Sequence, residues 1–182
     1  DSTVRGAWEK FFTDELVPFT RSTFNISHDI DDTFIAGNSM GGFGALSIGL
    51  GHPEVFGKIA ALSSALILDD IDGIGPGYHN PIADYDYYHS VFGDLSEVVG
   101  GPNDPRERMR RTLENGTTQP LYMTCGTEDG LVAHNRSFVA LARKTGASIV
   151  YEEHPGGHDW TFWNEQIVTV IEWMDTKKGS QQ

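Results

Sequence analysis

The stretch IAGNSMGGFGAL, residues 35–46, crowds four glycines around Ser39. The apolar run 33–37 before the serine predicts a short buried strand, and the apolar residues 40–50 after it predict a helix packed against a sheet. Gly37 and Gly41 complete the pattern G-x-S-x-G. Small residues there let the strand and helix backbones pass closely in a sharp turn that exposes the serine hydroxyl. The stretch therefore predicts a nucleophile, with the N–H of Met40 at the helix N-terminus available to a developing oxyanion.

The rest of the chain continues this alternation of strand and helix. Further strands are expected at 58–64, 121–125 and 148–152, and helices at 6–24, 105–114, 132–145 and 160–177, with Pro18 distorting the later part of the first helix. The order predicts an α/β fold, a mostly parallel sheet with helices on both faces. Residues 65–118 begin with a long segment rich in Asp, Gly, Tyr and His, and are expected to form a cap-like excursion.

Composition and charge limit the partners and the environment expected of this protein. The chain has 182 residues, with 13 Lys and Arg against 26 Asp and Glu, a net charge of −13. This charge disfavours nucleic acid and anionic membrane surfaces as partners. The single cysteine, Cys125, permits no intrachain disulfide, and no apolar run approaches the length of a membrane span. The location is left open between cytoplasmic and secreted. The glycosylation patterns at Asn25, Asn115 and Asn135 are short matches that carry little weight.

A serine nucleophile needs a histidine base. Of seven histidines, His158 is the best candidate because it lies in the Gly-rich loop HPGGHDW after the last expected strand, and His154, close by at the strand end, is the alternative. An exposed loop histidine without a catalytic role is the competing interpretation. The histidines show no metal-ligand spacing on a helix, so neither a metal site nor a cofactor is expected.

The histidine in turn needs a carboxylate that fixes its tautomer. The stretch CGTEDGL follows the strand at 121–125 and offers Glu128 and Asp129. Asp129 is preferred because Asp-Gly suits a sharp turn that aims a short carboxylate at the site, although it could instead cap the helix that follows. The order Ser39, Asp129, His158 is the triad order of α/β-hydrolases.

Three blocks, DDTFIAGNSMGGFGAL, YMTCGTEDGLVAHNRSF and HPGGHDWTFWNEQI, resemble the α/β-hydrolase family of esterase D and the tributyrin and feruloyl esterases, which also includes acetyl-xylan esterases and mycolyltransferases. The resemblance covers most of residues 6–175. It implies a serine carboxylesterase that forms an acyl-enzyme on Ser39, with Asp129 as acid and His158 as base. The expected substrates are short-chain acyl or hydroxycinnamoyl (feruloyl-type) esters, either small molecules or polysaccharide-linked. An S-formylglutathione hydrolase and a non-catalytic subunit are the alternatives.

The resemblance also implies a missing part. Family members carry several strands and an HG-type oxyanion loop before the nucleophile strand, whereas here only one helix precedes it. Residues 1–182 are therefore interpreted as the C-terminal part of one α/β-hydrolase domain, completed by a companion N-terminal polypeptide. The residues expected to contact substrate are Tyr78, His79, Tyr85 and Trp160. Plain packing of the tyrosines is an equally good interpretation.

Overall fold

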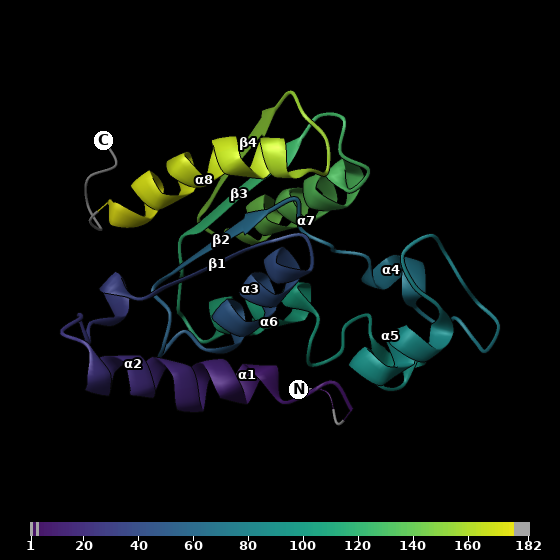
Figure 1. Ribbon diagram of the computed structural model, residues 1–182, viewed down its shortest axis with the longest axis horizontal. Coiled ribbons are helices and arrows are strands. Elements are labelled where there is room, and N and C mark those ends of the chain that lie inside the picture. The colour runs from purple at the N-terminus through teal and green to yellow at the C-terminus, as the bar shows by residue number, and fades with distance from the viewer. Residues whose placement is uncertain (1, 3, 177–182) are drawn as a thin grey trace.

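The computed structural model describes Ser2 and residues 4–176 (Figure 1). The helices and strands, in chain order, are α1 Trp8–Lys10, the π-helical η1 Phe11–Leu16, α2 Val17–Thr23, the 3₁₀ turn η2 Ile30–Asp32, β1 Phe34–Asn38, α3 Met40–Gly51, β2 Lys58–Leu62, α4 Leu68–Ile71, α5 Tyr85–Phe92, the 3₁₀ turn η3 Leu95–Glu97, α6 Pro105–Glu114, β3 Leu121–Gly126, α7 Val132–Thr145, β4 Ile149–His154 and α8 Trp160–Asp175. Every expected strand and helix is present, within two residues of its expected ends. The last residue of the helix expected at 160–177 lies outside the described residues.

The four strands form one parallel sheet in the order β1-β2-β3-β4. The predicted α/β fold with a parallel sheet is confirmed. Parallel strands need a crossover between each pair, and helices provide it: α3 joins β1 to β2, and α7 joins β3 to β4. The connection from β2 to β3 is the long segment 63–120, which carries α4, α5 and α6.

The sheet separates two apolar cores, because successive side chains of a strand point to opposite faces. The face of the sheet that includes Ile59 and Met123 packs with α3, α6 and α7. The opposite face, which includes Ala60 and Tyr122, packs with α8. Figure 1 shows the same arrangement, with α8 alone on one side of the sheet. Lys58–Leu62 is buried along its whole length, as expected of a strand covered on both faces.

The helix predicted at 6–24 is continuous over 8–23 but changes its winding. The π-helical turn Phe11–Leu16 lies just before Pro18 rather than after it. The proline ring clashes with the carbonyl four residues earlier, so the distortion belongs on the N-terminal side of Pro18. Glu9 fastens this helix to α6 through a bidentate ion pair with Arg108 (2.7 and 3.0 Å).

The excursion has a small apolar core of its own. Leu68, Tyr88, Leu95 and neighbouring residues from α4, α5 and η3 form it, beside the main body in Figure 1. Helix α6 instead contributes Met109 to the main core. The part that stands away from the sheet is thus shorter than 65–118 and ends before α6. Its aromatic residues supply the packing that its weak periodicity did not predict.

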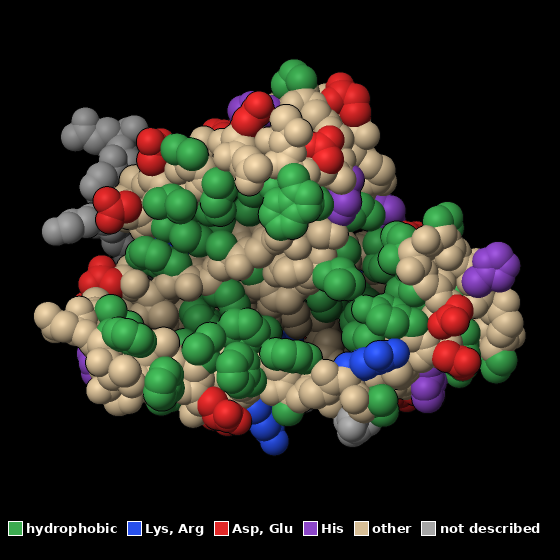
Figure 2. Space-filling model, in the orientation of Figure 1, with side chains coloured by type: hydrophobic (Ala, Val, Ile, Leu, Met, Phe, Trp, Pro, Cys, Tyr) green, Lys and Arg blue, Asp and Glu red, His purple; other side chains and the backbone are tan. Residues whose placement is uncertain are grey.

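One face of the molecule exposes apolar side chains. Figure 2 shows hydrophobic residues gathered between α8 and the α1–α2 helix, beside the edge strand β1. Exposed residues on these helices include Trp8, Phe11, Phe19, Ile167 and Ile171. Within the described residues, no helix has both the length and the apolar character needed to cross a membrane.

Candidate active site

Ser39 occupies the sharp turn between β1 and α3, with a backbone φ of 54°. This left-handed conformation is costly for a non-glycine residue and persists only where the surroundings enforce it. Three backbone hydrogen bonds do so: the Ser39 N–H donates to Leu62 (2.9 Å), and the Ser39 carbonyl accepts from Phe43 (3.1 Å) and Ala65 (3.0 Å). The Ser39 hydroxyl does not cap the helix. It is therefore available for another partner.

The two flanking glycines are not equivalent. A Cβ atom added to Gly37 would lie 2.2 Å from the carbonyl oxygen of Gly41, which no adjustment of a side chain could relieve. A Cβ added to Gly41 would meet nothing within 4 Å. The close approach of strand and helix therefore requires glycine at position 37 alone, and the expected need for a small residue on both sides is corrected.

The three side chains expected to act together lie in hydrogen-bond contact. The His158 Nε2 atom is 2.8 Å from the Ser39 hydroxyl oxygen, and its Nδ1 atom is 2.9 Å from the Asp129 Oδ2 atom. The Asp129 side chain is fully buried and its Oδ1 atom accepts from the Leu131 N–H (2.8 Å). A carboxylate held this way fixes one imidazole tautomer, leaving Nε2 free to accept the serine proton.

The neighbouring Glu128 has a different place. Its carboxylate accepts from the Gly156 N–H, and the Glu128 N–H donates to the Gly156 carbonyl (3.0 Å). Hydrogen bonds from the Thr127 side chain and the Gly156 backbone hold the pKa of Glu128 below its usual range. Glu128 thus clamps the loop that carries His158. The alternative base, His154, ends β4 and lies 3.5 Å from Glu152 rather than against Ser39.

Asn135, which the sequence offered only as a glycosylation pattern, is completely buried on α7. Its Oδ1 atom accepts from the Ser64 N–H (3.1 Å), and its Nδ2 atom donates to the carbonyls of Ser64 and Leu131 (both 2.9 Å). The amide therefore joins the loop after β2, which supports Ser39, to the loop that carries Asp129. In the sequence, Asn135 has the helical spacing of the apolar Phe138, Val139 and Ala142. A polar residue on such an apolar helix face was the signal that could have revealed this role.

A cavity of about 480 Å³ opens at Ser39 and His158. Its walls come from the two loops of the site, from α3 and from α5, and they are mostly apolar: Met40, Phe43, Ile67, Tyr87, Val91 and Phe92. Two of these residues are in contact, since the Tyr87 hydroxyl donates to the Met40 sulfur (3.7 Å). A cavity of this size and polarity suits the apolar part of a small ligand.

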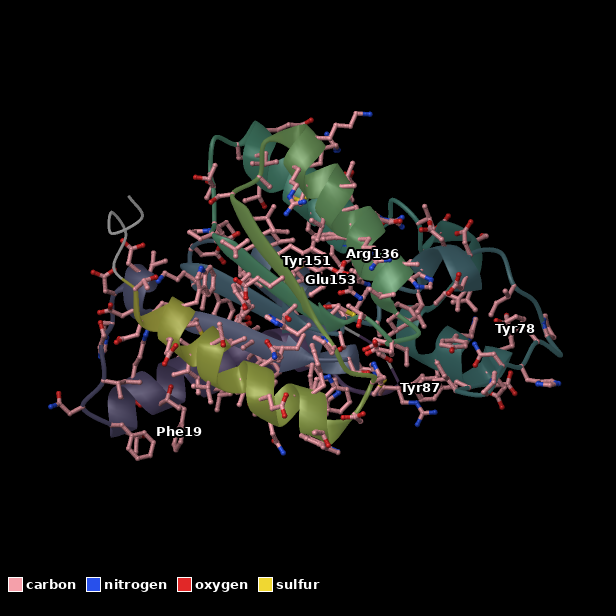
Figure 3. All side chains as sticks on the ribbon, turned by 90° about the horizontal axis from the view of Figure 1, so that it is seen from above. Phe19, Tyr78, Tyr87, Arg136, Tyr151 and Glu153 are labelled. Atoms are coloured by element: carbon pink, nitrogen blue, oxygen red, sulfur yellow. The ribbon has the colours of Figure 1, made fainter. Side chains whose placement is uncertain are left out.

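The four residues expected to contact substrate do not line this cavity. Tyr78 lies farther from the sheet than Tyr87 (Figure 3) and its hydroxyl accepts from Asn80 (3.3 Å). Tyr85 stacks on His89 with ring centroids 5.4 Å apart, and His79 belongs to an isolated bridge with Asp84. Trp160 is 70% exposed. The excursion does reach the site, but through Ile82 and the α5 side chains instead.

Cys125, the only cysteine, lies fully buried at the end of β3. Burial, with the nearby Asp129 carboxylate as a second cause, raises the pKa of the Cys125 thiol to about 12. The thiol is therefore neutral and unreactive at physiological pH. Across Ser2 and residues 4–176, no three His, Cys, Asp or Glu side chains are grouped so as to hold a metal ion.

Comparison with known proteins identifies the family of the chain. The family described as "Putative esterase" matches residues 2–174. The acetyl esterase of Caldicellulosiruptor saccharolyticus is 45% identical over 166 residues, which cover 91% of this chain and 62% of that relative. The chain thus spans less than two thirds of this relative.

Two solved structures from Staphylococcus aureus share the fold. The fluorophosphonate-binding serine hydrolase FphF matches with a TM-score of 0.79 and 26% identity, over 91% of this chain and 63% of that one. The S-formylglutathione hydrolase FrmB matches with a TM-score of 0.75 and 27% identity, over 88% of this chain and 61% of that one. These matches confirm the predicted α/β-hydrolase fold.

Proposed function

We propose that this chain, which belongs to the esterase family matched above, hydrolyses carboxylic esters through an acyl-enzyme. The observation that carries the proposal is the continuous hydrogen-bonded series from Ser39 through His158 to the buried Asp129. In the proposed mechanism, Ser39 attacks the ester carbonyl while His158 accepts its proton at Nε2. Asp129 stabilises the imidazolium that results. The proton then passes from His158 to the departing alkoxide. Water next attacks the acyl-enzyme, with His158 again as the base, and releases the acid.

The developing oxyanion requires hydrogen-bond donors. We assign one of them to the Met40 N–H, because Met40 is the first residue of α3 and the first N–H groups of a helix have no partner inside the helix. One such donor typically contributes about 10²–10³ in kcat.

The proposed substrates are esters with an apolar acyl group, either short-chain or hydroxycinnamoyl. Support comes from the apolar cavity, from Tyr87 and Tyr88 in its wall and from the similarity to an acetyl esterase. The S-formylglutathione hydrolase stays the second candidate because of the similarity to FrmB. Among the described residues, no Lys or Arg side chain lines the cavity, which offers little to the anionic glutathione.

The test uses a fluorophosphonate probe and a panel of esters. The probe is expected to label Ser39, identified by peptide mass spectrometry, and the protein to hydrolyse p-nitrophenyl acetate or methyl ferulate faster than S-formylglutathione. Ser39→Ala should remove nearly all activity and all labelling while the circular dichroism spectrum stays unchanged, since only one hydroxyl is lost. Activity within tenfold of the parent would contradict the assignment of Ser39, as would an inert protein that never labels.

We further propose that polypeptide beyond these 182 residues covers the exposed apolar face beside β1. Two observations support this: β1 is an edge strand of the sheet formed by the described residues, and apolar side chains gather on the same side (Figure 2). An open edge strand beside apolar surface readily pairs with added chain.

A further inference from the structure

A second cavity adjoins the catalytic one. Its volume is about 430 Å³, it is open to solvent, and the N-terminal segment, α3, α5 and Asn103 line it. Four residues line both cavities: Phe43 from α3, and Tyr87, Val91 and Phe92 from α5. These four side chains are therefore the wall between the catalytic cavity and the space behind it.

The centre of this wall is an aromatic pair. The rings of Phe43 and Phe92 meet edge to face, with centroids 5.7 Å apart and planes at 87°. This arrangement is a favourable one for two aromatic rings, so each holds the other in place. Phe92 is the last residue of α5, and both rings are only half-buried because a cavity lies on each side.

The end of the catalytic cavity that Phe43 and Phe92 line is on the acyl side of the proposed reaction. His158 must protonate the departing alkoxide, so the alcohol group has to lie against the imidazole. The cavity reaches His158, and from Ser39 it also extends past Met40 to Phe43 and Phe92, away from the imidazole. An acyl group bound to Ser39 with its carbonyl oxygen toward the Met40 N–H would extend in that direction.

We propose that the Phe43–Phe92 pair forms a partition that ends the acyl cavity and sets the longest acyl chain the enzyme accepts. This inference rests on the proposed esterase function and adds the residues that determine its specificity. Esters whose acyl group ends before the partition gain binding with each methylene, by about fourfold in kcat/KM, the equivalent of ~0.8 kcal/mol. Longer chains collide with the rings, and their kcat/KM falls.

The experiment removes the partition. Phe92→Ala deletes the ring between the two cavities, and kcat/KM is measured for p-nitrophenyl acetate, butyrate, octanoate and dodecanoate. The parent is expected to pass through a maximum along this series, and the variant to shift its maximum to a longer chain, with a gain of at least tenfold for the longest ester. Phe92→Leu, the smaller change, should shift the profile in the same direction and guards against a folding defect in Phe92→Ala.

Two controls separate the partition from a general loosening of the site. Ile82→Ala enlarges the catalytic cavity at a residue that does not line the second cavity, so the preferred chain length should stay that of the parent. Gly44→Leu fills the second cavity from α3, where an added Cβ meets nothing within 4 Å. By itself it should leave the acyl profile unchanged, and combined with Phe92→Ala it should abolish the gain for long esters.

The outcomes distinguish the two proposals. An unchanged acyl profile in folded Phe92→Ala and Phe92→Leu, with the parent active, would overturn the partition and leave the esterase function standing. A shift that Ile82→Ala reproduces, or that Gly44→Leu fails to reverse, would also overturn it. The same holds if Phe92→Ala changes the preference among acetates of different alcohols instead. A parent that hydrolyses no ester of the series would overturn the proposed function and the partition with it.

Discussion

Replacing Asn135 offers the sharpest test of how the site is held together. In Asn135→Ala the Ser64 N–H loses its acceptor, since Asn135 Oδ1 is the acceptor that the structure gives it. The two carbonyls that Asn135 bonds keep one other partner each: Leu66 donates to Ser64, and the Asn135 backbone N–H donates to Leu131. The variant therefore leaves one buried donor without a partner and weakens two acceptors.

The free energy of unfolding should fall accordingly. A buried donor without a partner costs about 1–3 kcal/mol, and each further hydrogen bond lost costs about 0.5–1 kcal/mol, for a total of about 2–5 kcal/mol. Because Ala65 after this loop donates to the Ser39 carbonyl, kcat should also fall, by roughly 10–100-fold, as the elbow loses its support.

Urea unfolding followed by circular dichroism measures the first quantity, and initial rates on p-nitrophenyl acetate measure the second. Ser137→Ala, an exposed neighbour on the same helix, is the matched control and should change stability by no more than about 0.5 kcal/mol. Asn135→Asp keeps the acceptor but turns an oxygen toward two carbonyls, so it should be at least as damaging as alanine. A loss below about 1 kcal/mol in Asn135→Ala, or a neutral Asn135→Asp, would refute the hydrogen-bond account.

Two further predictions concern the acid and the apolar face. Asp129→Asn should lower kcat by about 10³–10⁴ because the tautomer of His158 is no longer fixed, whereas Glu128→Gln should lower kcat no more than about tenfold because it only loosens the His158 loop. Steady-state kinetics compare the two variants, and the reverse ranking would give the acid role to Glu128. Residues 1–182 expressed alone should bind the dye ANS and self-associate through the face beside β1, as followed by light scattering; a monodisperse monomer that binds no dye would argue against additional covering chain.

The local pattern of the sequence was enough to locate the strands and the principal helices, and to select three residues whose side chains the structure brings into contact. Buried parallel strands are short apolar runs, and their helices carry period-3.6 patterns, so both signals are local. The G-x-S-x-G turn is equally local, because the clash that forbids a side chain at Gly37 comes from a residue only four positions away. His158 and Asp129 could be selected because parallel strands bring their C-terminal loops to one edge of the sheet.

What the sequence alone could not supply depends on contacts between distant segments. The role of Asn135 needs the loop after β2, 71 residues away, and the clamp by Glu128 needs the loop after β4. Within the excursion, tyrosine content did not indicate which ring faces the site: Tyr87 does, and Tyr78 and Tyr85 do not. On a short helix such as α5, neighbouring positions point to different surroundings, and the packing of α5 against the rest of the excursion and against Phe43 of α3 decides which ring faces the cavity. The sequence therefore determined which residue types were available, and the tertiary structure decided which of them are in contact.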